Sequence, residues 1–181
     1  MKIVIIEDDE KLSKAISGLL VDNGYGTLFA LNELEAETIL ENNFKEIAIA
    51  VVDLWMPPKK SSLDHRESGL RLIKLINEKY PSIVSIVHTG HEDLANAVKC
   101  MEAGAFSYTG KGEFKLLLPF INRAFEKFNE KIKLKKKQEI TERVSENLIR
   151  FQDNIENIVD SIRNLSASIQ RIQDEINEIQ K

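Results

Sequence analysis

The first two-thirds of this 181-residue chain alternate short apolar runs with amphipathic stretches, and no other feature limits its possible folds so strongly. This alternation is typical of βα units, which assemble into a parallel sheet with helices on both faces. The first, third and fourth apolar runs contain almost no polar residue, so we expect these strands in the middle of the sheet. The predicted strands are Lys2–Glu7, Gly26–Ala30, Ile47–Asp53, Ile83–His88 and Phe106–Thr109.

Amphipathic segments lie between these runs and predict helices, whose ends are marked by local signals. Asn23-Gly24 allows a left-handed cap, Pro81 stops the third helix and Gly104 ends the fourth. Between Pro57 and Arg66, paired prolines and polar side chains instead predict an exposed loop. The helices that we expect in this part of the chain are Lys11–Asn23, Glu33–Glu41, Glu67–Tyr80 and Glu92–Glu102.

The remaining third of the chain has a different pattern. From Phe120 to Lys181 there is neither glycine nor proline, and apolar residues recur at helical intervals. We therefore expect one long helix, which starts near Leu117 because Pro119 fits only within a first turn. The predicted organisation is an α/β domain over residues 1–128, followed over residues 129–181 by a helix that continues the last helix of that domain.

The second half of this helix carries an apolar seam in which steps of three and four residues alternate, as in the heptad of a coiled coil. A lone helix cannot bury such a stripe against itself, so we expect a partner helix, and a homodimer is favoured because two-fold oligomers are the most frequent. Isoleucine at both core positions favours a coiled coil of three or four helices, and the flanking positions carry little charge. The number of helices and their orientation therefore stay open. Upstream, Ile140, Val144 and Leu148 step by four, which predicts a shift in phase. The seam consists of Leu148, Phe151, Ile155, Ile158, Ile162, Leu165, Ile169, Ile172, Ile176 and Ile179.

Charged and hydroxyl side chains stand where several predicted strands end. In a parallel α/β sheet these carboxyl ends form the edge at which ligands bind. Carboxylates gathered there repel one another unless a cation lies between them, and oxygen ligands favour magnesium or calcium, of which magnesium suits a phosphate partner. A single acidic residue after a strand can equally cap the next helix, as we expect for Asp9, so the prediction of a site depends on the whole set. The set is Glu7, Asp8, Asp53, Thr89 and Lys111.

Four short runs contain these residues. They are Ile-Val-Ile-Ile-Glu-Asp-Asp at residues 3–9, Asp-Leu-Trp-Met-Pro at 53–57, His-Thr-Gly at 88–90 and Gly-Ala-Phe-Ser-Tyr-Thr-Gly-Lys at 104–111. Each run alone is weakly specific, but in this order and at strand ends they resemble the receiver domain of two-component response regulators over about residues 1–128. The resemblance implies a doubly wound, flavodoxin-like fold with a five-stranded parallel sheet.

The resemblance also implies how the strand-end residues act. Asp53 is the nucleophile that accepts a phosphoryl group from the phosphohistidine of a sensor histidine kinase. Glu7 and Asp8 match the acid pair that holds Mg²⁺, and Asp53 with the backbone carbonyl of Trp55 completes the protein ligands. The cation offsets charge on the transferred phosphoryl oxygens, and Lys111 adds a further positive charge.

Further positions follow from the same resemblance. Thr89 is expected to move its hydroxyl onto a phosphoryl oxygen and Tyr108 to follow inward, which makes the pair a switch, although both are also ordinary strand residues. Trp55 and His91 lie where the family controls water access, and the bulky indole predicts slow autodephosphorylation. The segment 57–68 is longer than usual for the family, and we expect it to adapt partner recognition.

Together these features predict a response regulator that acts as a switch and not as a metabolic enzyme, with an oligomerising or partner-binding coiled coil as its output. A single cysteine, Cys100, excludes an intramolecular disulfide. The apolar run at residues 3–6 is too short for a signal peptide or a membrane span, so we expect a cytoplasmic protein without membrane attachment.

Two other classes of protein agree less well with the sequence. A DNA-binding regulator would use the lysines at 131, 133 and 135–137, but this run is short and lacks the arginine and asparagine that contact bases, and the net charge is −4. Nucleic acid is therefore not the expected partner. A haloacid-dehalogenase-like phosphatase expects a second aspartate two residues after its nucleophile, where this chain has Trp55.

Overall fold

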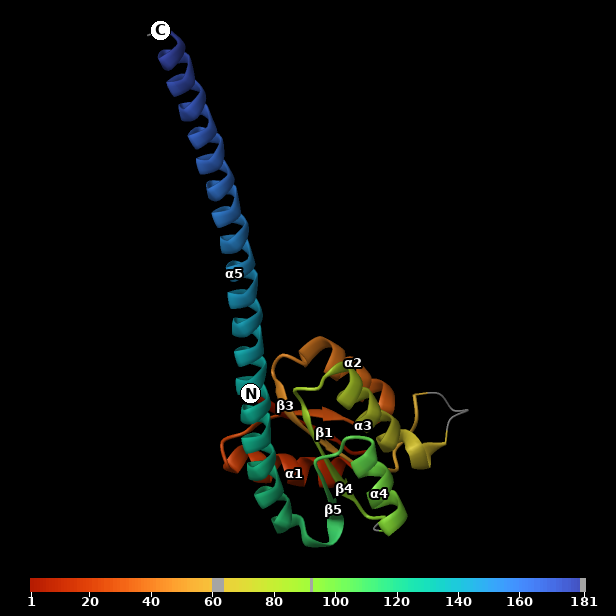
Figure 1. Ribbon diagram of the computed structural model, residues 1–181. Coiled ribbons are helices and arrows are strands. Elements are labelled where there is room, and N and C mark those ends of the chain that lie inside the picture. Colours follow the sequence, from red (N-terminus) through yellow and green to blue (C-terminus); the bar gives the residue numbers. More distant parts are fainter. Residues whose placement is uncertain (60–63, 92, 180–181) are drawn as a thin grey trace. The chain divides into compact units, whose positions relative to one another are not determined.

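The structure is a computed structural model that describes residues 1–59, 64–91 and 93–179, and over these residues it shows a parallel sheet, helices on both of its faces and a long C-terminal helix (Figure 1). Contacts divide the chain into two units, which we call the α/β unit (Met1–Ile132) and the helical unit (Lys133–Lys181). The elements are β1 (Lys2–Ile6), α1 (Glu10–Asp22), β2 (Gly26–Ala30), α2 (Glu33–Asn43), β3 (Ile47–Val52), η1 (His65–Glu67), α3 (Ser68–Lys79), β4 (Val84–Thr89), α4 (Leu94–Glu102), β5 (Ser107–Gly110), η2 (Lys111–Leu116) and α5 (Leu117–Ile179).

The five strands are parallel and lie in the order β2-β1-β3-β4-β5 over the described residues. β1, β3 and β4 are the inner strands, as their apolar sequences predicted, and every residue of β3 and β4 is buried. Ile6 pairs with Val52, so β1 and β3 end side by side where the strand order changes direction. The residues that follow these two strands therefore meet at the switch point of the sheet, where ligands bind in folds of this type.

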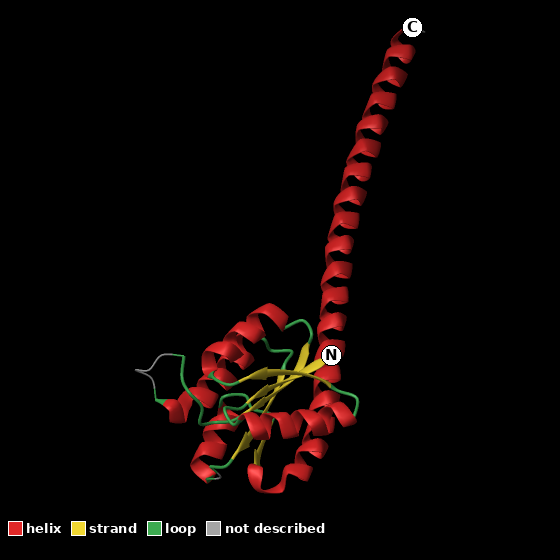
Figure 2. Ribbon diagram, turned by 180° about the vertical axis from the view of Figure 1, so that it is seen from behind, coloured by secondary structure: helices red, strands yellow, loops and turns green. Residues whose placement is uncertain are grey.

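Helices lie on both faces of the sheet (Figure 2). Different helices supply the two apolar layers that cover these faces. Residues of α2, α3 and α4, such as Leu40, Ile73 and Cys100, pack on one face. Residues of α1 and the start of α5, such as Ile16 and Ile121, pack on the other. The predicted doubly wound fold is thus confirmed.

The prediction of an exposed loop between Pro57 and Arg66 is wrong for its last residues. Residues 60–63 lie outside the described residues, but His65–Glu67 form a 3₁₀ turn because the Asp64 carboxylate accepts a hydrogen bond from the Arg66 backbone N–H at 2.8 Å. The paired prolines and polar side chains predict a loop, because they do not reveal this local capping contact. The helix that was expected to begin at Glu92 begins at Leu94, with Asp93 as its N-cap; Glu92 itself also lies outside the described residues.

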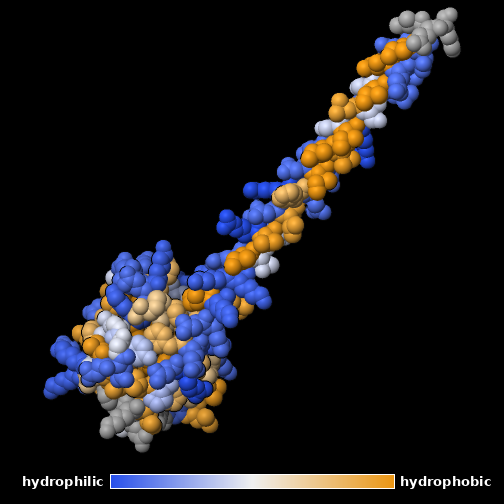
Figure 3. Space-filling model, turned by 90° about the vertical axis from the view of Figure 1, so that its left-hand side faces the viewer, coloured by the Kyte–Doolittle hydropathy of each residue, from blue (hydrophilic) through white to orange (hydrophobic). Residues whose placement is uncertain are grey.

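The α5 helix runs without interruption into the helical unit, in agreement with the long helix predicted from the missing glycine and proline. In that unit the seam residues from Leu148 to Ile176 are 48–68% exposed, and they form a continuous apolar stripe along the helix (Figure 3). The side chain of Ile179 lies outside the described residues. Among the described helices, none is both long and apolar enough to cross a membrane.

Candidate functional site

The carboxylates of Glu7, Asp8 and Asp53 come together at the switch point of the sheet. Their ligand oxygens all lie within 4.8 Å of one another. Backbone bonds fix their positions, since the Glu7 N–H donates to Ala30 and the Asp53 N–H donates to Ile6. Glu7 and Asp53 are buried at 2% and 5% exposure while Asp8 is exposed, so the cluster combines two inner acids with one that faces solvent.

Lys111, at the start of η2, neutralises the inner part of this cluster. Its Nζ lies 2.7 Å from Asp53 Oδ2 and 2.7 Å from Glu7 Oε2. Burial raises the pKa of the Glu7 carboxyl above its ordinary value, against the lowering effect of the Lys111 hydrogen bond. Burial acts to lower the pKa of Lys111, but its hydrogen bonds to Asp53 and Glu7 outweigh it and raise that pKa. The lysine therefore stays charged between two buried acids.

The donor set suits a hard divalent cation. Carboxylate oxygens from Glu7, Asp8 and Asp53 are the ligands that Mg²⁺ prefers, and the exposure of Asp8 leaves room for the waters that Mg²⁺ retains. The backbone beside Trp55 is held in place, because the Leu54 carbonyl accepts from the Gly69 N–H and the Met56 carbonyl accepts from the Ser68 hydroxyl. The residues present thus fit Mg²⁺, with the Trp55 carbonyl as a further candidate ligand.

Gly69 brings the start of α3 against the backbone of Asp53. A Cβ atom at this position would lie 2.2 Å from the Asp53 carbonyl oxygen and 2.6 Å from Leu54 Cα, both of which are backbone atoms that cannot easily move. The Asp53 carboxylate is oriented from the same segment, since its Oδ1 accepts from the Leu54 N–H at 2.7 Å. The acid is therefore held by its own loop and by close packing of the next helix.

Thr89 and Tyr108, predicted as the switch pair, are both tied to the backbone of His91. The buried Thr89 hydroxyl accepts a hydrogen bond from the His91 N–H at 3.3 Å, and the Tyr108 hydroxyl donates to the His91 carbonyl at 2.6 Å. The two residues lie on the neighbouring strands β4 and β5. One residue of the β4–α4 loop thus links the predicted switch residues, a connection that the sequence had not suggested.

Trp55 and His91, the predicted water-access residues, stack on each other. Their ring centroids are 3.2 Å apart with an interplanar angle of 23°. His65 approaches the indole edge-on at 6.0 Å, and the Arg66 guanidinium lies 5.7 Å from its ring centroid. The indole is therefore held between the β4–α4 loop and the end of the extended segment after β3.

An ion pair between a buried carboxylate and a partly exposed arginine, which sequence reasoning missed, connects the two described ends of the segment after β3. Glu33, 1% exposed, accepts from Arg71 Nε at 2.8 Å and from Arg71 Nη2 at 2.9 Å. The same carboxylate accepts from the Lys59 N–H, and Arg71 Nη1 donates to the Asp64 carbonyl. Burial acts to raise the pKa of Glu33, but the Arg71 hydrogen bonds outweigh it and lower that pKa. The sequence predicts Glu33 only as the first residue of a helix, and nothing local marks Arg71 as its partner.

His88 is a second buried group that the sequence did not single out. It is 1% exposed at the end of β4, and neither ring nitrogen has a hydrogen-bond partner among the described residues. Burial and, to a smaller extent, the charge of Lys111 lower its pKa to about 4, and Asp53 opposes the shift. The imidazole beside Thr89 is therefore neutral at physiological pH.

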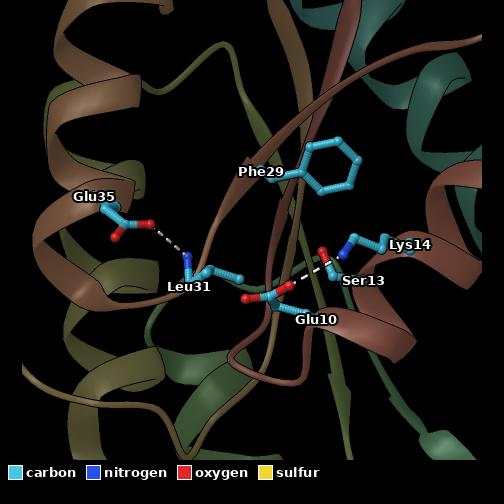
Figure 4. A pocket seen from close by; sticks show the side chains of 6 residues that line it. All are labelled: Glu10, Ser13, Lys14, Phe29, Leu31 and Glu35. Carbon is cyan, nitrogen blue, oxygen red and sulfur yellow. Dashed lines mark hydrogen bonds and ion pairs between the residues drawn. The ribbon is translucent and has the colours of Figure 1, made fainter.

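A separate hollow lies over β2 and the starts of α1 and α2 (Figure 4). Its acidic groups are already engaged: the Glu10 carboxylate pairs with Lys14 at 3.1 Å, and Glu35 accepts from the Leu31 N–H at 2.9 Å. These carboxylates serve local structure. The hollow therefore lacks the convergent acids and lysine of the Glu7–Asp53 cluster.

Comparison with known proteins identifies relatives of the α/β unit. The family description "Response regulator receiver domain" matches residues 3–117. A putative NtrX-like response regulator of Rickettsia conorii is 30% identical over 111 residues, which are 61% of this chain and 22% of that protein. A cyclic di-GMP phosphodiesterase of Thermotoga maritima is 30% identical over 154 residues, 81% of this chain and 39% of that protein. The chain thus spans well under half the length of these curated relatives.

A solved structure shows the same fold. The crystal structure of a response regulator receiver domain protein from Clostridium thermocellum superposes with a TM-score of 0.61 and 31% sequence identity. The match covers 70% of this chain and 94% of that one.

Proposed function

This chain belongs to the response regulator receiver family, and from that premise we propose that Asp53 accepts a phosphoryl group from a sensor histidine kinase and thereby switches the protein's output. One observation carries the proposal: Glu7, Asp8 and Asp53 converge within 4.8 Å, and Lys111 lies on the two buried acids. The proposed setting is the cytoplasm.

In the proposed reaction an Asp53 carboxylate oxygen attacks the phosphorus of a phosphohistidine. A new O–P bond forms, the N–P bond breaks, and its electron pair returns to the imidazole of the kinase. Glu7, Asp8, Asp53 and the Trp55 carbonyl would hold Mg²⁺, which supplies positive charge to the phosphoryl oxygens. Lys111 Nζ, 2.7 Å from Asp53 Oδ2, is placed to bind a phosphoryl oxygen after transfer.

The proposed switch involves a loss of the bonds to His91. If the Thr89 hydroxyl moves to bind a phosphoryl oxygen, it leaves the His91 N–H that it now accepts from. The Tyr108 hydroxyl donates to the carbonyl of the same residue, so a displacement of His91 would also change this contact of Tyr108. Phosphorylation would thus alter the surface formed by β4, α4 and β5.

The intrinsic fluorescence of the chain offers a direct test, because Trp55 is its single tryptophan and lies two residues after Asp53. Titration with Mg²⁺ and then with beryllofluoride, a phosphoryl mimic, should change Trp55 fluorescence in the parent and leave Asp53→Asn without a beryllofluoride response. Asp9→Asn is the matched control, because it removes one exposed acid while asparagine can still cap α1. A beryllofluoride response in Asp53→Asn equal to that of the parent would refute the proposal.

For the helical unit we propose self-association through the seam, with a dimer as the favoured form. Its support is the 48–68% exposure of seam residues from Leu148 to Ile176, which a single helix leaves in water. Sedimentation equilibrium should give a mass above that of the 20.6 kDa monomer. A monomeric mass at micromolar concentration refutes self-association, and equal masses with and without beryllofluoride show that the assembly does not depend on phosphorylation.

The phosphodiesterase activity named for the Thermotoga relative is not proposed here. This chain spans 39% of that protein, and the 154 shared residues overlap the receiver match. The chemistry that we propose for this chain is phosphoryl transfer to its own aspartate, followed by slow hydrolysis of the acyl phosphate.

A further inference from the structure

The Glu33–Arg71 ion pair begins a chain of hydrogen bonds that leads to the turn after β3. The arginine binds both oxygens of the Glu33 carboxylate, through Nε at 2.8 Å and Nη2 at 2.9 Å. The same Nη2 donates to the Ser68 hydroxyl at 3.1 Å, and that hydroxyl donates to the Met56 carbonyl at 2.9 Å. Glu33, Ser68 and Met56 are each at most 1% exposed, so solvent hardly competes for these contacts. The ion pair is therefore connected to the residue that follows Trp55.

The glutamate holds two further points of the same turn. Its backbone N–H donates to the Pro57 carbonyl at 3.1 Å, and its carboxylate accepts from the Lys59 N–H at 2.9 Å. Residues 53–59 belong to no helix or strand, so these contacts take the place of a regular ladder of backbone hydrogen bonds. The position of the turn thus depends on Glu33, which lies on a different element, at the start of α2.

The arginine also holds the second segment that packs on Trp55. Arg71 Nη1 donates to the Asp64 carbonyl at 3.1 Å, and Asp64 is the N-cap of the η1 turn. The next two residues lie against the indole: the His65 ring is edge-on at 6.0 Å, and the Arg66 guanidinium is 5.7 Å from the ring centroid. One guanidinium thus supports both the backbone that follows Trp55 and the turn that packs on its ring.

From these contacts we propose that Glu33 and Arg71 are positioning residues for Trp55: they fix its carbonyl as a ligand for Mg²⁺ and its indole beside His91. The inference rests on the proposed phosphorylation at an Mg²⁺ site, and it deepens that proposal by naming residues that act on the site through the turn after β3. Mg²⁺ demands near-ideal octahedral geometry with oxygens at about 2.0–2.1 Å. A small displacement of the turn would therefore weaken the contribution of the Trp55 carbonyl.

The chemistry of the pair suits positioning more than stabilisation. Removing the Glu33 carboxylate from water is unfavourable, and this desolvation offsets much of its attraction to Arg71. The guanidinium, however, is planar and rigid, so its donors reach the Glu33 carboxylate, the Ser68 hydroxyl and the Asp64 carbonyl in fixed directions. A lysine ammonium is a single point charge and cannot span these acceptors. The arginine therefore supplies geometry that a positive charge alone does not.

Titration of Trp55 fluorescence with Mg²⁺ alone, without a phosphodonor, tests the hold on the carbonyl. Arg71→Lys keeps a positive charge beside Glu33 but removes the planar fork. Ser68→Ala removes the hydroxyl that joins Arg71 to the Met56 carbonyl. Loss of an outer-shell partner typically costs roughly 10–100-fold in metal affinity. Because only one ligand is affected here, each variant should weaken Mg²⁺ binding about three- to tenfold.

Two control variants separate positioning from stability and from the metal site itself. Ile76→Val removes one methylene group from the buried side of α3, about two turns after Ser68. It should lower the urea midpoint about as much as Ser68→Ala does and leave the Mg²⁺ affinity at the parent value. Asp8→Asn removes a candidate ligand and should lose most of the Mg²⁺ affinity.

Quenching of Trp55 fluorescence by acrylamide, measured without Mg²⁺, tests the hold on the indole. Arg71→Lys should raise the quenching constant roughly twofold, because the η1 turn opens more often once its contact with α3 is lost. Ser68→Ala leaves the contact between Arg71 and Asp64 in place and should stay near the parent. A quenching constant in Arg71→Lys equal to that of the parent would contradict the proposed hold on the indole.

The outcomes of the Mg²⁺ titration distinguish this proposal from the one on which it rests. Parent-like Mg²⁺ affinity in Arg71→Lys and Ser68→Ala, with weak binding in Asp8→Asn, would overturn the positioning role while the metal site stands. Equal weakening in Ile76→Val and Ser68→Ala would show that affinity follows stability and would also overturn it. Parent-like affinity in Asp8→Asn would instead overturn the metal site.

Discussion

The α/β unit and the helical unit use the same apolar residue type in opposite ways. In the α/β unit, isoleucines such as Ile5, Ile16 and Ile73 are completely buried. In the helical unit, Ile155 and Ile158 are 56% and 59% exposed. The first unit contains its own packing partners, whereas the second presents an exposed apolar stripe, for which we propose a second copy of the chain as the partner. A regular sequence pattern therefore predicts a helix in both cases but a tertiary structure in only one.

The charged residues differ between the two units as well. In the α/β unit the important contacts join residues far apart in sequence, such as Lys111 with Glu7 and Arg71 with Glu33. In the helical unit the ion pair between Arg163 and Asp160 spans a single turn and is exposed. Long-range pairs shape a site, while local pairs support the helix by only a few tenths of a kcal/mol each.

The same substitution made in both units tests the difference between them most strongly. Ile73→Ala should lower the free energy of unfolding of the α/β unit by about 4 kcal/mol, because it opens a cavity in a closed core. Ile158→Ala should leave the denaturant midpoint of that unit unchanged and weaken association. Urea unfolding followed by Trp55 fluorescence measures both variants. An equal loss of stability in the two would show that the helical unit is part of the core.

His88 allows a pH test of how closed the core is. Its pKa is about 4 in the folded protein and ordinarily about 6.5, so below pH 6.5 the unfolded chain takes up a proton that the folded chain resists. The parent should thus lose about 3 kcal/mol of stability from this group as the pH falls from 6.5 to 4, and none above pH 6.5. His88→Leu should lack this loss. Unfolding curves at pH 7 and pH 4 check the difference, and identical pH dependence in both proteins contradicts the burial argument.

Gly69 tests the close packing that positions the acid. Gly69→Ala should destabilise the α/β unit by about 2–3 kcal/mol and weaken the beryllofluoride response, because its Cβ would meet backbone atoms at 2.2 and 2.6 Å. Gly18→Ala is the matched control. A Cβ atom added at position 18, on α1, would have no other atom within 4 Å. This substitution should therefore stabilise the protein by up to about 1 kcal/mol. Equal effects of the two substitutions would remove the proposed role of Gly69.

The smallest expected effect concerns the indole that stacks on His91. Trp55→Asn should shorten the lifetime of the acyl phosphate severalfold, because it removes bulk that obstructs an attacking water. Trp55→Phe, which keeps an aromatic ring able to stack, is the control and should stay near the parent. The lifetime is followed by loss of phosphoprotein after removal of the phosphodonor, and an unchanged or longer lifetime in Trp55→Asn defeats the proposal.

Some features of the site could be predicted because they depend on short sequence patterns. Apolar runs that end in acids predict both the inner strands and the convergence of Glu7 with Asp53, since parallel strands bring their ends together. The Glu33–Arg71 pair could not be predicted, because its partners lie 38 residues apart and neither has a distinctive local pattern. The link of Thr89 to Tyr108 through His91 likewise depends on how a loop closes over two strands.

The proposed switch depends on phosphorylation of Asp53 in an Mg²⁺-dependent reaction. The most direct measurement is to treat the protein with phosphoramidate, trap the acyl phosphate by borohydride reduction and locate the modified residue by peptide mass spectrometry. We expect modification at Asp53 that depends on Mg²⁺ and is absent from Asp53→Asn. Modification at Asp8 or another acid in place of Asp53, or none in the presence of Mg²⁺, would contradict it.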